Sequence, residues 1–527
     1  MPSENIDPAF SKLSGALIKN FENIEALNTD EKISVNILVS KVASWYEKLR
    51  TSMDYGNEET ILRRAIERIL KRLLFLDEGS KATAENLVRE LIWAGYFKDL
   101  TVSGSIVEKV ATSIRLHLTL KDRVIEKRLV QNADIYEFCV QLLSSDIDAI
   151  LLPHKEKEAM SNFMFQILRN TVDIVDDSKQ TRDVQVFIAI RKNFARDDLA
   201  FLRYKLFLQI FGKLSDANFD SVVTNFAEGF KEIEYQLSYP RKERIFNHIK
   251  RNTPPFLILF EVLMQEKGNI LKAVKDREGF RDNVFAICLR KYKTIGQKIR
   301  TAIVRSFIFI LVTKAFVALF IEGTFERIFF GSVQWATIGI NTIAPPLFMV
   351  IAGLTIRTPD KRNSQKIYVD IYKLLFDENP QITQGISVKL KSNSVKSIKD
   401  YIFSVLWFLS TLLVFGLISI VLTKLQFNIL SQAIFLFFIA IISFLSYRIY
   451  QAANMYTVIE KQNIFTPIID FFFVPVIRVG RRFTEGIAQI NFTIIVIDFI
   501  IEAPFKGLVG FFEQWFSFLA NKREELE

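Results

Sequence analysis

Two patterns of hydrophobic and polar positions divide the chain near residue 300. Up to Arg300, apolar residues recur three or four positions apart among charged ones, which is the period of an amphipathic helix. Beyond Thr301 the apolar residues form nearly continuous runs, and residues 402–422 contain no ionisable side chain. At about 1.5 Å of rise per residue, that run matches a hydrocarbon core of roughly 30 Å. The sequence therefore predicts an integral membrane protein with a large helical part outside the bilayer.

Four apolar runs are long enough to cross a bilayer as helices. They lie near residues 302–321, 328–356, 402–422 and 429–447, and a polar loop at 357–401 separates the second from the third. Short connections within each pair predict two membrane hairpins. Pro345 and Pro346 lie inside the second run and lack backbone donors, so we expect a kink or an interruption there.

Basic residues flank these runs asymmetrically. They concentrate before the first run and in the 357–401 loop, whereas the short connections contain only Arg327 and Lys424. Because basic flanks are retained on the cytoplasmic side, both termini are predicted to be cytoplasmic. Basic flanking residues are expected to contact anionic lipid headgroups. The flanking set is Arg300, Arg305, Arg357, Lys361, Arg362, Arg481 and Arg482.

The first 300 residues predict an all-α cytoplasmic part. Proline is absent between Pro8 and Pro153 and between Pro153 and Pro240, so long helices with short polar joints are expected. The predicted helices begin near residues 28 and 57 and cover about 84–97, 135–151, 160–175, 199–214 and 219–239. The predicted domains are two cytoplasmic helical subdomains at 1–152 and 153–300, a membrane domain at 301–450 and a membrane-interfacial tail at 451–527.

The helix predicted from about residue 57 carries basic residues beside an apolar stripe. The stripe comprises Leu62, Ile66, Ile69 and Leu73, and the basic residues are Arg63, Arg64, Arg68, Lys71 and Arg72. Such a helix can lie on a membrane or bind a polyanion. We favour the more common arrangement, in which the stripe is buried and the charged face is solvated.

Lys314 is an ionisable residue inside the first apolar run, where an unpaired charge costs at least about 2.5 kcal/mol. The second run places Gln334, Thr337 and Asn341 at comparable depth, so these four residues are a candidate polar seam. We expect no acidic counterpart for Lys314. A helix-packing contact or a lysine reaching the interface is therefore favoured over a solute or proton pathway.

The tail is apolar between residues 487 and 519 except for a thin polar stripe. Asp498, Glu502 and Lys506 follow one another at four-residue steps, which places them together on a helix. We interpret the tail as interfacial amphipathic helices broken near Pro504. The alternative is a further pair of spans whose carboxylates face a bundle interior, as in an ion pathway.

Catalytic and cofactor signatures are weak. The chain has two Cys and three His without metal-ligand spacing, and it has no glycine-rich phosphate loop. Carboxylates at Asp173, Asp176, Asp177 and Asp183 could hold magnesium, but solvated helix ends explain them better. We therefore expect no catalytic site, no cofactor and no metal. No motif identifies a known family.

The net charge of +10 follows partly from the basic residues that flank the membrane spans, so nucleic acid is not expected as a partner.

The sequence favours a non-enzymatic, multi-pass protein of a prokaryotic cytoplasmic (inner) membrane. Its helical domain would act as a scaffold that binds an unidentified protein partner while tethered to the bilayer. The alternatives are a channel or transporter with a polar seam around Lys314, assembled as a homo-oligomer, and a membrane-embedded enzyme that uses the aspartates.

Overall fold

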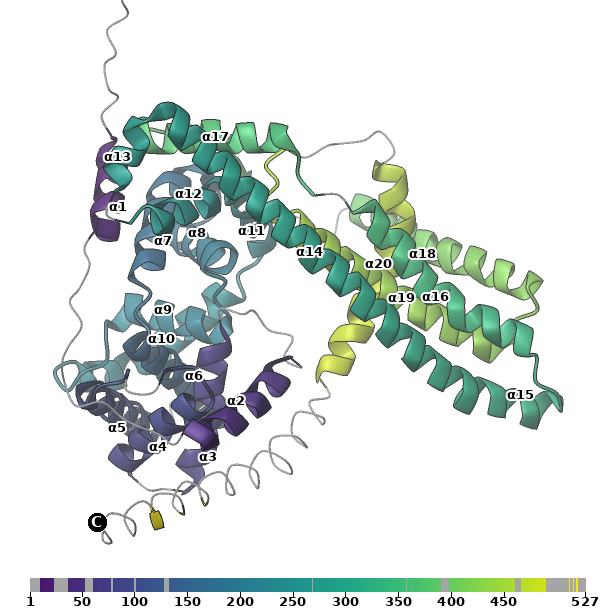
Figure 1. Ribbon diagram of the computed structural model, residues 1–527, viewed down its shortest axis with the longest axis horizontal. Coiled ribbons are helices and arrows are strands. Elements are labelled where there is room, and N and C mark those ends of the chain that lie inside the picture. The colour runs from purple at the N-terminus through teal and green to yellow at the C-terminus, as the bar shows by residue number, and fades with distance from the viewer. Residues whose placement is uncertain are drawn as a thin grey trace, which may run out of the picture. The chain divides into compact units, whose positions relative to one another are not determined.

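The computed structural model describes most of the chain as helices. The described residues are 10–22, 37–52, 60–76, 79–98, 101–127, 132–267, 269–356, 358–389, 398–459, 466–489, 511, 515 and 518–519. Within them the only strands are β1 (Val172–Ile174) and β2 (Ile386–Val388), so the all-α prediction is confirmed (Figure 1).

The chain forms two compact units, which we call the N-terminal unit and the membrane unit. The N-terminal unit comprises Pro8–Thr253, Leu375–Leu390 and Ile494–Glu527. The membrane unit comprises Met1–Asp7, Pro254–Leu374 and Lys391–Thr493. The predicted division at 152, 300 and 450 stays a prediction.

Eleven α-helices of the N-terminal unit lie in the described part of the chain. They are α1 (Lys12–Glu22), α2 (Ile37–Ser52), α3 (Ile61–Leu76), α4 (Ser80–Trp93), α5 (Gly104–Glu126), α6 (Asn132–Leu151), α7 (Lys155–Leu168), α8 (Lys179–Ile190), α9 (Leu199–Phe211), α10 (Phe219–Leu237) and α11 (Lys242–Asn252). A π-helical turn, η3 (Arg191–Ala195), extends α8. Large apolar side chains such as Ile66, Leu87 and Phe226 are fully buried between these helices.

The predicted helices differ from the observed ones mainly at their ends. The helix predicted over 160–175 is wrong at its C-terminal end, because α7 stops at Leu168 and β1 follows. β1 pairs in parallel with β2, and it buries Val172 and Ile174 while Asp173 is exposed. Two β-branched residues that are buried on either side of an exposed one form the alternating pattern of a strand, which explains why β1 is not helical. The starts expected near residues 28 and 57 both lie outside the described residues, and the described part of the second of these helices is α3, Ile61–Leu76.

Four basic residues of α3 pair with carboxylates, so the prediction of a solvated charged face is wrong, whereas Ile66, Ile69 and Leu73 of the apolar stripe are buried as predicted. Arg63 Nη2 lies 2.6 Å from Asp198 Oδ2, and Arg68 Nη2 lies 2.9 Å from Glu47 Oε2. The further pairs are Lys71 with Glu67 and Glu137, and Arg72 with Glu90. Because these carboxylates already neutralise the face, α3 is poorly suited to hold a polyanion.

Acidification should loosen the contact between α5 and α6. Burial lowers the pKa of His117 on α5, so the folded state holds the ring neutral while the unfolded chain binds a proton near pH 6.5. Its contribution to stability is therefore present above about pH 6.5 and is lost as the pH falls below that value. Hydrogen exchange of α5 and α6 amides, corrected for intrinsic rates, should show reduced protection at pH 5.

The matched control for this pH dependence is His117→Gln, which cannot take up the proton. Its loss of protection between pH 7 and pH 5 should be smaller than that of the wild type. An equal loss in both proteins would contradict the assignment to His117. Burial also lowers the pKa of His248, on α11, so amides of that helix should be compared separately.

The membrane unit contains four helices long and apolar enough to cross a bilayer. They cover Arg277–Phe330, Trp335–Thr355, Tyr401–Lys424 and Ile429–Ala453. The described elements are α12 (Pro254–Gln265), α13 (Ile270–Lys275), α14 (Arg277–Val317), π-helical η4 (Ala318–Glu322), α15 (Gly323–Phe330), α16 (Trp335–Thr355), α17 (Lys361–Phe376, whose last two residues belong to the N-terminal unit), α18 (Ile398–Lys424), α19 (Ile429–Ala453) and α20 (Thr466–Gln489). The prediction of four membrane-spanning helices is therefore supported.

The boundary predicted between the first two spans is wrong. The first helix does not end near Ile321 but continues through η4 and α15 to Phe330, and the second begins at Trp335 instead of residue 328. Gly331, whose φ of 71° suits a residue without Cβ, begins the turn between them. α16 continues through Pro345 and Pro346, so no interruption occurs there.

Asn363 joins the segment before the first hairpin to the segments that follow each hairpin. Asn363 on α17 donates to the hydroxyl of Tyr292 on α14 at 2.8 Å and to the carbonyl of Tyr456, after α19, at 2.7 Å. Its own Oδ1 accepts from the backbone N–H of Val458 at 2.8 Å. The segments that lead into the first span, out of the second and out of the fourth therefore meet at one end of the helices.

α20 packs across the hairpin formed by α18 and α19. Gly480 lies so close to α19 that an added Cβ would overlap the carbonyl oxygen of Ala440. Val476, Val414 and Ala440 form a small buried cluster near the middle of both spans. A helix at headgroup level would contact the ends of spans, so this contact argues against an interfacial position for this part of the predicted tail.

Candidate intramembrane polar site

A buried ion pair lies within the first membrane-spanning helix. Lys314 Nζ donates to Glu322 Oε1 at 2.8 Å, and both side chains are 0% exposed. The expectation that Lys314 lacks an acidic counterpart is therefore wrong. Because the pair is neutral as a whole, it avoids most of the cost of an isolated charge in hydrocarbon.

The π-helical turn η4 explains why these two residues meet. In a regular α-helix, residues eight positions apart point about 80° away from each other. A π-helical turn inserts one residue, so Glu322 occupies the position that a seventh residue would take, about 20° from Lys314. The irregular turn therefore brings the carboxylate onto the face that carries the lysine.

Two further spans complete the hydrogen bonding of the carboxylate. Asn341 Nδ2 on α16 donates to Glu322 Oε2 at 2.6 Å, and Ser431 Oγ on α19 donates to the same oxygen at 3.1 Å. Asn341 Nδ2 also lies 3.3 Å from the carbonyl oxygen of Ser431. The charge pair thus connects the first, second and fourth spans.

Glu326 makes a second polar connection one helical turn further along, near the hairpin tips. Its Oε2 accepts from the backbone N–H of Gln334 at 2.8 Å, and its Oε1 accepts from Asn428 Nδ2 at 2.8 Å. Asn428 also caps α19 by accepting from the N–H of Ser431 at 2.8 Å. Both tips are therefore joined at the end opposite to Asn363.

Two atoms of the site have incomplete polar surroundings. Lys314 Nζ lies 5.0 Å from the centre of the Phe438 ring, a cation–π contact. Asn341 Oδ1 is buried and accepts no hydrogen bond from the described residues. A buried carbonyl oxygen without a donor is costly and marks a place where a water molecule or a polar solute would be stabilised.

The structure brings together only part of the predicted seam. Asn341 lies beside the Lys314–Glu322 pair, whereas Gln334 is exposed at the hairpin tip. Thr337 Oγ1 donates to Gln334 Oε1 at 3.3 Å and has no direct contact with Lys314 among the hydrogen bonds of the described residues. The sequence prediction missed Glu322 and Glu326, because it ended the first span one residue before Glu322, and it missed Ser431, which lies in the fourth span.

The other predicted site residues lie elsewhere. Among the basic flanking residues, Arg300, Arg305, Lys361, Arg362, Arg481 and Arg482 are exposed. Arg357, Asp498, Glu502 and Lys506 lie outside the described residues. Their proposed contacts with lipid headgroups and with one another stay predictions.

Two of the four aspartates considered for magnesium make local contacts. Asp177 accepts from Tyr239 Oη at 2.8 Å and from the N–H of Ser178 at 2.6 Å, and Asp183 pairs with Arg182. Within the described part of the chain, no three His, Cys, Asp or Glu side chains are placed to hold a metal ion together. In comparisons with protein-family models, with curated proteins and with solved structures, nothing matches this chain.

Proposed function

We propose that this protein is a membrane-anchored interaction protein, whose spans hold the extramembrane helices at the bilayer where they bind a protein partner. One observation carries the proposal. All four candidate spans belong to the membrane unit, whereas the described helices of the N-terminal unit bury a core of their own and include no candidate span. This division suits the membrane unit to a lipid environment and the N-terminal unit to an aqueous one.

The surface of the membrane unit supports the anchoring role. Its spans expose large apolar side chains along their length, for example Phe309, Leu354 and Phe408 at 66%, 80% and 64%. Exposed apolar area on this scale is stable only against lipid or another apolar surface. Anchoring raises the effective concentration of the extramembrane helices near any partner on the same surface, which strengthens binding without a new contact.

The closed geometry of the polar site favours a structural role for Lys314. Lys314 and Glu322 are fully buried and bind each other, and Asn341 and Ser431 satisfy the second carboxylate oxygen. A solute could reach them only after helices separated. We propose that the pair selects one packing of the spans, as buried polar contacts between membrane helices do.

A transporter or channel is the second candidate function, and one observation favours it. Asn341 Oδ1 remains without a donor beside a desolvated ion pair, which is where a translocated proton or polar solute would bind. In this case the spans would have to open toward each side of the membrane in turn. The Lys314–Glu322 pair would then break during each cycle.

Photo-crosslinking and flux measurements separate the two functions. We expect a photoreactive residue at Leu199, Ile210 or Tyr235, which are exposed on the N-terminal unit, to capture one discrete protein in cells. The same group at Phe408 on α18 should capture lipid. Proteoliposomes containing the full chain should conduct ions and small solutes no faster than empty vesicles. Flux that Lys314→Leu abolishes, without loss of insertion, would contradict anchoring as the function and support transport.

A further inference from the structure

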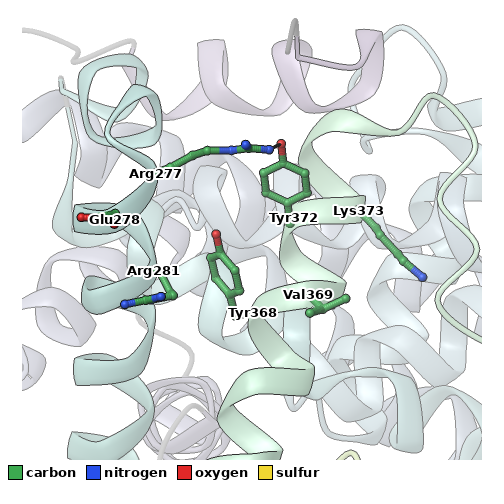
Figure 2. A pocket seen from close by; sticks show the side chains of 7 residues that line it. All are labelled: Arg277, Glu278, Arg281, Tyr368, Val369, Tyr372 and Lys373. Atoms are coloured by element: carbon green, nitrogen blue, oxygen red, sulfur yellow. Dashed lines mark hydrogen bonds between the residues drawn. The ribbon is translucent and has the colours of Figure 1, made fainter. Parts of the chain in front are cut away.

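A groove in the membrane unit lies between the N-terminal end of α14, which precedes the first apolar run, and α17, which follows the second. Its volume is about 400 Å³, and it is lined by Arg277, Glu278, Arg281, Tyr368, Val369, Tyr372 and Lys373. Figure 2 shows Arg277 reaching from α14 toward the hydroxyl of Tyr372, with Tyr368 beside them and with Arg281 and Lys373 on opposite sides. Basic and aromatic side chains thus dominate the groove.

The positive charge of Arg277 is available to a ligand. Its guanidinium donates to the Tyr372 hydroxyl and lies 5.0 Å from the centre of the Tyr372 ring, so its partner is a neutral group. In the described part of the chain, neither Arg277 nor Lys373 has a carboxylate oxygen within 4 Å, although Lys373 attracts the Asp370 carboxylate on the same helix over a longer distance. Arg281 is partly neutralised, because its Nη2 lies 3.3 Å from Asp282 Oδ1.

The two helices that form the groove are strongly basic. Between Arg277 and Arg305, α14 carries eight Lys or Arg and two Asp or Glu, and α17 carries four Lys or Arg and one Asp. Such a surface attracts an anionic partner over distances comparable to the Debye length. The single acidic lining residue, Glu278, leaves the groove with a positive balance.

The position of the groove argues against lipid headgroups as its ligand. Arg277 precedes Arg305, at the start of the first apolar run, by 28 residues, which is about 42 Å along a helix. Screening at physiological salt acts over only about 8 Å. This distance along α14 from the first apolar run favours an occupant from the aqueous phase.

We propose that this groove binds an acidic peptide segment of a protein partner, with its carboxylates on Arg277 and Lys373 and an apolar side chain against Tyr368 and Tyr372. Tyrosine and arginine are among the side chains enriched at the centres of protein interfaces. Three basic lining residues are too few for tight binding of a nucleic acid, whose affinity grows with the number of phosphates neutralised. The inference rests on the proposed function and names the chemistry of the partner.

The test uses the full chain in nanodiscs of neutral phosphatidylcholine and a short fluorescein-labelled peptide of alternating Glu and Phe. Fluorescence anisotropy should show saturable binding of this peptide, and a peptide in which Lys replaces Glu should not bind. Arg277→Glu/Lys373→Glu should weaken binding at least tenfold. The milder variant Arg277→Gln/Lys373→Gln should weaken it less, and it keeps the test decisive if the charge reversal perturbs folding.

Lys81→Glu/Arg89→Glu is the matched control, because it makes the same change in charge at exposed residues of a groove between α4 and α5. It should leave peptide affinity unchanged. Equal affinity in wild type and both Arg277/Lys373 variants would overturn the proposal, and so would no saturable peptide binding or tighter binding of a single-stranded oligouridylate. If a partner is crosslinked to the N-terminal unit but the peptide fails to bind, only the groove is refuted. If the peptide binds but Lys314-dependent flux appears, only the anchoring function is refuted.

Discussion

Lys314→Met should destabilise the membrane unit by about 3 to 5 kcal/mol, because Glu322 would then be buried without a cation beside it. The two other donors to Glu322, Asn341 and Ser431, carry no charge and cannot replace the ammonium. The loss should appear as a lower unfolding temperature in detergent, followed by the fluorescence of the tryptophans.

The double variant Lys314→Met/Glu322→Gln provides the control, since it removes both charges but keeps an acceptor for Asn341 and Ser431. It should recover most of the stability that Lys314→Met loses, as replacement of whole buried pairs by neutral groups often does. If the double variant were as unstable as the sum of both single variants, the pair would not be coupled in the way that the 2.8 Å contact implies.

Gly480→Val should separate α20 from α19. Any Cβ at position 480 would overlap the carbonyl oxygen of Ala440, which is backbone and cannot rotate away as a side chain can. Overpacking of this kind costs about 1 to 3 kcal/mol and occasionally more. Cysteines introduced at Phe437 and Phe483, whose ring centres lie 5.1 Å apart, should crosslink efficiently in the Gly480 protein and poorly in the variant.

Gly416→Val is the matched control for this contact. Gly416 also lies in an apolar helix, α18, but a Cβ there would have nothing within 4 Å. Crosslinking between positions 437 and 483 should therefore be unchanged. An equal loss of crosslinking in the two variants would show that the close approach of α20 to Ala440 does not hold the helices together.

The apolar runs predicted the membrane helices well because lipid selects for length and composition, which a sequence displays directly. The third and fourth helices agree with the predicted spans within a few residues at most ends. The predicted end of the first helix is too early, because Glu322, Gly323 and Glu326 resemble the polar end of a span. In the structure these residues continue the helix, since Asn341 on α16 and Asn428 at the start of α19 donate hydrogen bonds to the carboxylates of Glu322 and Glu326.

The polar site was harder to predict than the spans. Lys314 was recognisable from its cost in hydrocarbon, but its partner depends on the extra residue of η4, which shifts the helical face and has no clear sequence signal. Ser431 lies 117 residues from Lys314 along the chain, so its contribution depends on how two hairpins pack. The spacing of Lys314 and Glu322 would be a useful signal only if a π-helical turn were assumed between them.

The first membrane helix is continuous over 54 residues, which corresponds to about 80 Å and is more than twice the hydrocarbon thickness (Figure 1). Because the helix is continuous, a change in the tilt of its apolar part also moves its other end. If a thinner bilayer tilted the helix by about 10° around the centre of its apolar run, the Arg277 end, about 52 Å away, would move by about 9 Å. The position of the Arg277 end would then depend on the thickness of the membrane, although this end lies outside the apolar run. A peptide bound there would move along the bilayer surface when a change in lipid composition altered that thickness.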